Sequence, residues 1–179
     1  MIRPFILSTV FAATAFSALA DTTETYDFSG FNELDIAAGV EVKYETASTY
    51  SVVADFSRGG PDDMKIRQDG DRLYISRKMT SGWGDKLRVT VRITSPKLNE
   101  VEASSGSSIQ ARGINADDFT LRVSSGASAE LSGSCKELDL KVSSGGDADA
   151  KDLQCLSLSA SASSGGSASA YAIESATGK

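Results

Sequence analysis

The sequence of 179 residues has no histidine, only two cysteines and an excess of acidic over basic side chains. The absence of histidine removes the commonest general base and any Ser-His-Asp triad, so serine-based hydrolysis is not expected. Two cysteines without a histidine also make a poor zinc site. The formal net charge of −6 argues against nucleic acid, and against simple electrostatic adhesion to an anionic membrane, because both need a basic surface. No cofactor is predicted.

The first twenty residues have the pattern of a signal peptide. Arg3 is followed by a largely apolar stretch, residues 5–16, and Ala18-Leu19-Ala20 is a small-residue cleavage site. The alternative is a retained N-terminal anchor, but the stretch is short for a membrane span, which needs about 20 residues. No cysteine follows the cleavage site, so a lipoprotein is not indicated. We therefore predict a cleaved signal peptide (1–20), export to the periplasm or cell surface, and one mature domain (21–179).

Four Ser-Ser-Gly triplets recur in the second half of the chain. Their glycines lie 20, 19 and 20 residues apart, at Gly106, Gly126, Gly145 and Gly165. A fixed period of this length is the signature of a solenoid, in which each repeat stacks on the one before. Glycine suits a turn there because it adopts positive φ without steric cost. Gly39, which follows two alanines, is predicted to mark an earlier turn of the same kind.

On both sides of each turn glycine, apolar and polar residues alternate with period two, which is the strand signal. In the second copy Phe119, Leu121 and Val123 precede the turn. The predicted fold class is all-β: a single-stranded parallel β-helix, or β-solenoid, whose flattened two-sheet coils have about 20 residues each. Residues 96–173 are the regular repeats. Residues 26–95 are predicted to form irregular N-terminal coils without a helix. The Asp69-Gly70 pair indicates either a local hairpin or a tight corner of a coil.

Polar residues between the apolar columns are predicted to face water. Glu102 and Arg122 occupy one column in adjacent repeats, so we expect an exposed ion pair that contributes little. The interior thins toward the C-terminus, where Leu158, Ala160 and Ala162 replace larger residues. Alanine has poor strand propensity and buries little area. The last repeat is therefore expected to be weak, with an open C-terminal edge through which two copies could associate.

The two cysteines occupy equivalent positions in adjacent repeats, because Cys135 and Cys155 each lie ten residues before a turn glycine. Stacked positions of this kind are close to the Cα separation that a disulfide requires, about 4.4 to 6.8 Å. Export to an oxidising compartment would permit the bond. We predict a structural disulfide, and reactive thiols or metal ligands are the alternatives.

The nearest approach to a catalytic or calcium-binding cluster is Asp147, Asp149 and Asp152 in the third repeat. Calcium binding is conceivable there, but the nine-residue glycine and aspartate repeat of calcium-binding β-rolls is absent, which favours a solvated turn. Trp83, in a Ser-Gly-Trp-Gly loop, could contact a carbohydrate or protein or fold back over the apolar end of the solenoid. A polysaccharide-active enzyme is the less favoured alternative, and no catalytic or metal-binding residue is predicted.

The ordered set of motifs resembles a known family. The Ser-Ser-Gly repeats, residues 31–42 and residues 91–101 are similar to the putative auto-transporter adhesin, head GIN domain family, and the resemblance covers residues 26–173. It implies an exported bacterial β-helix similar in shape to pectin lyases, with a role in cell adhesion and no established catalytic residues. We therefore predict a non-catalytic binding domain whose partner is a glycan or a component of the cell envelope or surface. The alternative is an assembly module that associates through its C-terminal edge.

Overall fold

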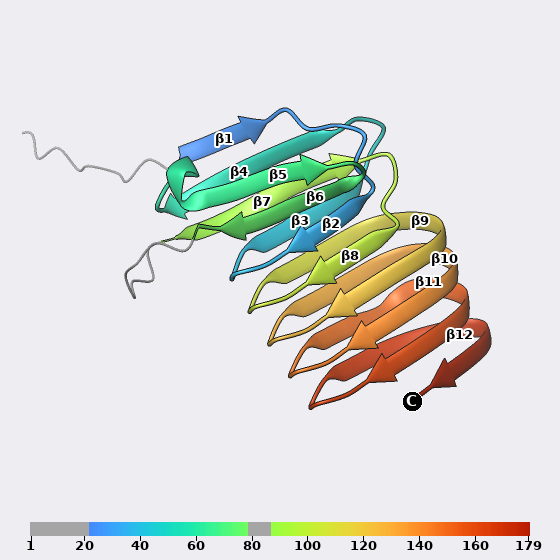
Figure 1. Ribbon diagram of the computed structural model, residues 1–179. Helices are drawn as coiled ribbons and strands as arrows, with labels where there is room; N and C mark the ends of the chain where they lie inside the picture. The colour runs from blue at the N-terminus through green and yellow to red at the C-terminus, as the bar shows by residue number, and fades with distance from the viewer. Residues whose placement is uncertain (1–21, 79–86) are drawn as a thin grey trace, which may run out of the picture.

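The structure is a computed structural model that describes residues 22–78 and 87–179 (Figure 1). The predicted signal peptide and Trp83 lie outside the described residues. The described chain is all-β, and its one helical element is a single 3₁₀ turn, η1 (Pro61–Asp63). No helix in the described ranges is long and apolar enough to cross a membrane. The strands are β1 (Thr22–Tyr26), β2 (Glu33–Ile36), β3 (Glu41–Thr46), β4 (Ser51–Arg58), β5 (Met64–Asp69), β6 (Arg72–Arg77), β7 (Arg88–Ser95), β8 (Glu100–Ala103), β9 (Ser108–Val123), β10 (Ser128–Val142), β11 (Asp147–Ala162) and β12 (Ser167–Gly178).

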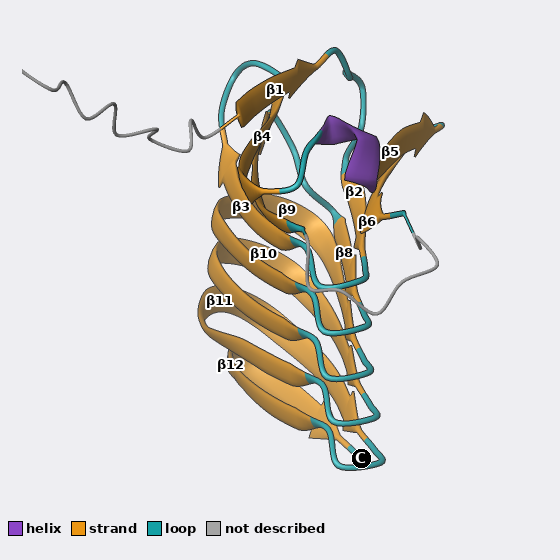
Figure 2. Ribbon diagram, turned by 90° about the vertical axis from the view of Figure 1, so that its left-hand side faces the viewer, coloured by secondary structure: helices purple, strands orange, loops and turns teal. Residues whose placement is uncertain are grey.

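All twelve strands belong to one strongly curled sheet. The long strand β9 makes the curl visible, because its first half pairs with β3 and its second half pairs with β8. The sheet therefore has two walls. The first wall contains β1, β4, β7, β3 and the first halves of β9 to β12, and the second wall contains β5, β6, β2, β8 and the second halves. Figure 2 shows the strands bending continuously along one side of the molecule, while tight turns line the other side.

From β9 to β12 the chain repeats one arrangement in parallel register. Phe119 of β9 lies beside Leu138 of β10, and Leu138 lies beside Leu158 of β11. Between the walls the Ser-Ser-Gly triplets form tight turns, in which Ser125 and Gly126 have φ values of 52° and 72°. The amide of Ala127 donates to the carbonyl of Ser124 at 3.0 Å, and two positive φ values inside such a turn are typical of type I′. The same pair of positive φ values occurs at Ser105-Gly106, Ser144-Gly145, Ser164-Gly165 and Ala38-Gly39.

The N-terminal part does not repeat this arrangement. The expectation of irregular parallel coils there omitted the antiparallel strand pairs. Strands β1, β4 and β7 pair antiparallel, and β5 and β6 form an antiparallel hairpin across Gly70 and Asp71. A two-residue loop can join only antiparallel neighbours, which explains the hairpin. The 3₁₀ turn η1 also departs from the expectation of no helix, because Pro61 fixes the φ of its first residue in the helical range.

The inside of the curl is filled by apolar side chains from both walls. Phe31, Tyr44 and Phe119 are among the largest side chains that are fully buried. Burying a side chain of this kind contributes roughly 1.5–3 kcal/mol. Toward the C-terminus the filling becomes thin, as Leu158 and Ala160 are only partly buried and most of β12 is exposed. The core is therefore thickest around β3, β9 and β2.

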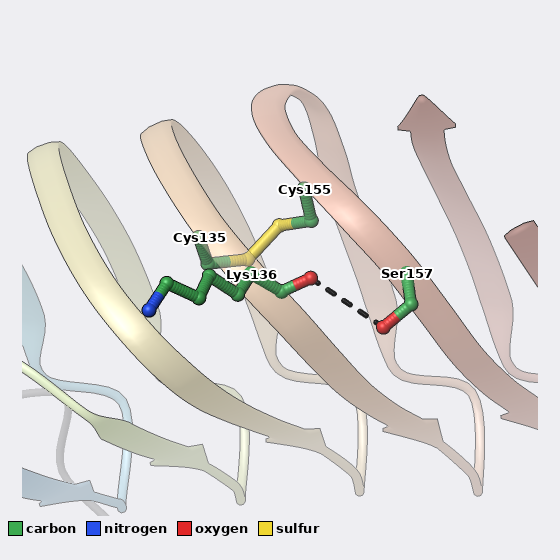
Figure 3. Close-up of a disulfide and its surroundings, with 4 residues drawn as sticks. All are labelled: Cys135, Lys136, Cys155 and Ser157. Carbon is green, nitrogen blue, oxygen red and sulfur yellow. Dashed lines mark hydrogen bonds between the residues drawn. A yellow bond between two sulfur atoms is a disulfide. The ribbon is translucent and has the colours of Figure 1, made fainter. Parts of the chain in front are cut away.

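A disulfide joins Cys135 of β10 to Cys155 of β11, with their Cα atoms 4.5 Å apart (Figure 3). The two residues are direct partners in the β10–β11 register, which is the relation that the shared position before the turn glycine predicts. Beside the bond, the Ser157 hydroxyl donates to the carbonyl of Lys136 at 3.4 Å. In a chain-entropy estimate, closing a loop of this length stabilises the fold by about 3 kcal/mol. The bond ties together the two strands where the core becomes thin.

Candidate functional site

Three hollows of the described surface lie on the outer sides of the two walls, and apolar side chains fill the inside. On a strand, side chains alternate between the two faces, so outward residues of neighbouring strands line up in columns across a wall. These columns decide which side chains meet. A candidate site is therefore a group of adjacent columns and not a stretch of sequence.

A groove of about 390 Å³ lies over β4, β7, β3 and β9 of the first wall, and we name it the basic groove. Its outward residues form two adjacent columns that each cross these four strands. Tyr44 and Ile93 lie beneath the columns in the core. The first column reads Val53, Arg92, Lys43 and Gln110, and the second reads Ser51, Thr94, Glu45 and Arg112.

Two of the three cations in the basic groove are direct neighbours, since Lys43 of β3 lies opposite Arg92 of β7. Each has a carboxylate beside it: Lys43 Nζ lies 3.4 Å from Glu41, and Arg92 forms an ion pair with Asp55 of β4. Like charges directly opposite in a sheet are destabilising, so these carboxylates offset part of the repulsion.

Arg112, the third cation, has a different environment. It is exposed and lies opposite Glu45 in the β3–β9 register. The two side chains do not form an ion pair, and the described residues provide no other hydrogen bond or carboxylate for Arg112. Its guanidinium therefore faces solvent at one end of the groove with its donors available.

The floor and sides of the basic groove are held by buried or local hydrogen bonds. The Tyr44 hydroxyl lies 2.9 Å from the Ser95 hydroxyl, inside the first wall. The Thr94 hydroxyl donates to the carbonyl of Thr49 at 2.8 Å. On the β10 side, the Gln110 amide donates to Glu130 at 3.1 Å and closes the groove there. A ligand would thus meet a rigid sheet surface and not a mobile loop.

The second wall carries a network of carboxylates around Arg72. Its guanidinium lies 2.8 Å from Glu33, 2.9 Å from Glu100 and 3.5 Å from Glu102. Arg122 also forms its ion pair with Glu100. The predicted ion pair between Glu102 and Arg122 is therefore wrong. The two residues are register neighbours, but Glu102 pairs with Arg72 and Arg122 pairs with Glu100. The ion pairs of Arg72 and Arg122 are partly buried and connect the neighbouring strands β6, β2, β8 and β9. We therefore interpret this network as structural.

Asp35 lies at the edge of that network. Burial raises the pKa of its carboxyl, and the neighbouring carboxylate of Glu102 raises it further, while Arg72 and Arg67 oppose this shift. Nearby, the Arg67 guanidinium stacks 3.6 Å from the ring centre of Tyr74. Asp35, Arg67 and Tyr74 are among the residues that line a hollow of about 210 Å³. The stacked guanidinium covers one face of the aromatic ring, so that face is not open to a sugar.

A third hollow, of about 340 Å³, lies over the second halves of β9 to β12. Its outward residues are carboxylates and the Thr120 hydroxyl on β9 and β10, and hydroxyls on β11 and β12. The carboxylates come from Asp118, Glu137 and Asp139, and the hydroxyls include Ser157, Ser159, Ser175 and Thr177. This surface is negative or neutral, in contrast to the basic groove.

The sequence candidates for chemistry are not gathered into a site. Asp149 pairs with Lys151 at 3.0 Å, and this hydrogen bond lowers the pKa of the carboxyl. Within residues 22–78 and 87–179, no three carboxylates or cysteines are grouped so that they could hold a metal ion. Both cysteines are in the disulfide, so neither is a free thiol.

Sequence reasoning missed the basic groove. Its cations come from three strands that are far apart in the chain, and strand order cannot be deduced from the spacing of the repeats. The signal that existed was local: Lys43, Arg92 and Arg112 each occupy an outward position beside a buried residue. Nothing in their spacing indicated that they meet.

Known proteins show the same fold. The crystal structure of a putative adhesin from Bacteroides fragilis NCTC 9343 is similar with a TM-score of 0.64 and 16% identity, over 90% of this chain and 95% of that one. The crystal structure of a putative lipid binding protein from Parabacteroides distasonis ATCC 8503 has a TM-score of 0.50 and 12% identity, over 88% and 94% of the two chains. No curated protein matches. Residues 30–179 match the family described as putative auto-transporter adhesin, head GIN domain, and the chain therefore belongs to that family.

Proposed function

We propose that this chain is an exported, non-catalytic binding domain that attaches to an extended component of the cell envelope or cell surface, with a glycan as the favoured partner. The observation that carries the proposal is that every hollow described above lies on an outer wall and is lined by polar side chains in strand register. Such surfaces offer many hydrogen bonds to a long ligand. They do not gather an acid, a base and a nucleophile around one reacting atom.

We further propose that the scaffold is a parallel β-solenoid with Ser-Ser-Gly turns, formed by residues 21–179 after removal of a signal peptide (1–20). The parallel register of β9, β10 and β11, with partners 19 or 20 residues apart, supports this reading. A solenoid presents equivalent positions at intervals of one strand spacing, about 4.8 Å. A repeating polymer is a suitable partner for such a surface.

The packed interior favours a ligand on the outer walls over a lipid held inside. One similar structure is named a putative lipid binding protein, and another is named a putative adhesin. In this chain Phe31, Tyr44 and Phe119 fill the space between the walls and are fully buried. An acyl chain inside the curl would have to displace them, at a cost of several kcal/mol of lost packing.

The proposal is tested by a binding screen of the purified protein against neutral and acidic polysaccharides, peptidoglycan and membrane fractions. We expect saturable binding to at least one glycan, with no release of shorter products over long incubation. Heat-unfolded protein is the control for non-specific adsorption. Turnover of a polysaccharide, or the absence of binding to every glycan and envelope fraction, would contradict the proposal.

A second candidate function is assembly through β12, and a specific observation favours it. Three large apolar side chains at the last two strands are exposed: Leu156 (39%), Tyr171 (58%) and Ile173 (55%). Within the described residues β12 pairs with β11 alone, so its other edge presents unpaired backbone groups. Sedimentation at increasing concentration tests this function, and Tyr171→Ser with Ile173→Ser should abolish any dimer. A monomer at all concentrations would remove this candidate.

A further inference from the structure

We propose that the basic groove is the ligand site of this domain and that it binds an oxyanion, a carboxylate or a sulfate, carried on an acidic polysaccharide. This inference rests on the proposed binding function and names the class of glycan. It follows from the arrangement of Lys43, Arg92 and Arg112 on the first wall.

Lys43 and Arg92 are like charges that repel each other across the first wall. They are direct register partners on β3 and β7, an arrangement that disfavours the sheet unless negative charge is close. Glu41 and Asp55 lie in the next column and hold the two cations in position from one side. A ligand oxyanion above the wall would be shared by both cations, which gives it charge-assisted hydrogen bonds from a fixed geometry.

Arg112 has no carboxylate partner among the described residues. A guanidinium presents a planar fork of donors that matches a carboxylate or a sulfate. Because Glu45 lies opposite Arg112 without pairing with it, the fork remains open. Arg112 is thus the cation that can engage a ligand without first breaking an internal ion pair.

The length and volume of the basic groove fit a short saccharide segment. The first column crosses β4, β7, β3 and β9, so Arg92 and Gln110 are separated by two strand spacings, about 10 Å. A groove of about 390 Å³ along this path has room for a short saccharide segment and not only for a single small ion. Ser51 and Val53, at the β4 side, add a hydroxyl and an apolar contact of the kind that a sugar ring uses.

Negative charge outside the basic groove would limit an anionic ligand to the groove. The chain carries a formal net charge of −6. Beyond Gln110 the same column continues with Glu130 and Asp149, which would repel an anionic ligand. The attractive surface therefore ends at β9, and an acidic polysaccharide would be held on β7, β3 and the first half of β9.

The test measures binding of the purified protein to four probes: polygalacturonate, dextran sulfate, neutral dextran, and vesicles of phosphatidylglycerol in phosphatidylcholine. The groove variant is Lys43→Gln with Arg112→Gln. The control variant is Lys141→Gln with Lys151→Gln, which removes the same charge from exposed lysines outside the groove. We expect the native protein to bind at least one of the two acidic polysaccharides. The groove variant should bind that polysaccharide at least tenfold more weakly, the control variant less than twofold more weakly, and rising salt should weaken binding.

Each other outcome overturns the inference in a distinguishable way. Equal losses in both variants would mean attraction by overall charge and not by the groove. Binding to neutral dextran that the groove variant retains, without binding to either acidic polysaccharide, would leave the proposed function standing and remove the acidic ligand. Groove-dependent binding to anionic vesicles alone would replace the glycan with a lipid headgroup. Failure to bind any glycan or envelope fraction would remove the proposed function itself.

Discussion

The N-terminal and C-terminal parts of the molecule use the same kind of wall for different purposes. From β9 to β12, parallel strands repeat the same turn and the same inward columns. In β11 and β12 the inward residues are increasingly alanine and the outward residues are increasingly serine. From β1 to β8, the walls include antiparallel strands, and their outward faces carry the basic groove and the Arg72 network. The regular repeats therefore end in a surface of small polar side chains, whereas the irregular N-terminal pairing brings charges from distant segments together.

This difference suggests a division of labour between the two parts. A register of identical turns needs only small residues and glycine, so it leaves few positions for ligand-specific side chains. The N-terminal strands break the repeat, and in doing so they place Lys43 beside Arg92 and Arg72 beside Glu33. We regard β10 to β12 as support, and the N-terminal walls together with the first half of β9 as the binding surface.

The largest expected effect comes from a substitution at Gly133, where the backbones of β10 and β9 approach each other closely. A Cβ added at Gly133 would lie 2.1 Å from the carbonyl oxygen of Ile114, so β9 and β10 would have to separate. We expect Gly133→Ala to lower the free energy of unfolding by more than about 3 kcal/mol.

The matched control is Gly126→Ala, where a Cβ meets nothing within 4 Å and only the positive φ is unfavourable. That change should cost about 1–2 kcal/mol. Urea unfolding followed by circular dichroism compares the two variants. Equal losses would show that the bend at Gly133 tolerates a side chain and that the repeat is looser than described.

Removal of the disulfide is expected to have the next largest effect. The double variant Cys135→Ala and Cys155→Ala should lose about 3 kcal/mol, because the unfolded chain regains the freedom of the closed loop. Hydrogen exchange should accelerate more in β10, β11 and β12 than in β4 and β7, because the strands that the bond joins also open locally. Uniform acceleration over the whole chain would contradict the idea that the bond reinforces only the thin end of the core.

The thinning of the core is tested by two truncations in one column. Leu138 is 2% exposed, whereas its neighbour Leu158 is only partly buried. Leu138→Ala should cost about 3 kcal/mol and Leu158→Ala about 1 kcal/mol, because a half-buried side chain loses less area and leaves no closed cavity. Thermal unfolding measures both variants. A larger loss at Leu158 would reverse the comparison between the two ends.

The smallest effect concerns the charge at Asp35 on the second wall. Because its pKa is raised in the folded protein, ionised Asp35 opposes folding above the folded-state pKa, and this cost disappears as the pH falls below the unfolded-state value. Asp35→Asn should therefore be more stable than the native protein at neutral pH, by less than about 1 kcal/mol, because partly exposed charges are screened.

The advantage of Asp35→Asn should vanish in acid, where the native carboxyl is protonated. Urea unfolding at pH 7 and at pH 3 measures this change. An advantage of the same size at both pH values would mean that the carboxyl is not unfavourably placed when ionised.

The repeat made part of this structure predictable from the sequence. Counting from the turn glycines located the inward residues Leu121 and Leu140 and the register partners Cys135 and Cys155, because stacked repeats turn a sequence interval into a spatial neighbour. The antiparallel N-terminal pairing was not predictable in this way, since no period applies there. The charged contacts were missed for a second reason. Arg122 forms its ion pair with Glu100 and not with its register partner Glu102, because long side chains also reach diagonal neighbours in a sheet.

The most direct test of the account is to map where an acidic polysaccharide touches the protein. Backbone amide shifts of the labelled protein are followed by NMR as polygalacturonate fragments are added. The account predicts that the shifts change on β3, β7 and the first half of β9, around Lys43, Arg92 and Arg112, and remain constant on β11 and β12. Changes centred on β10 to β12, with none in the basic groove, would contradict it.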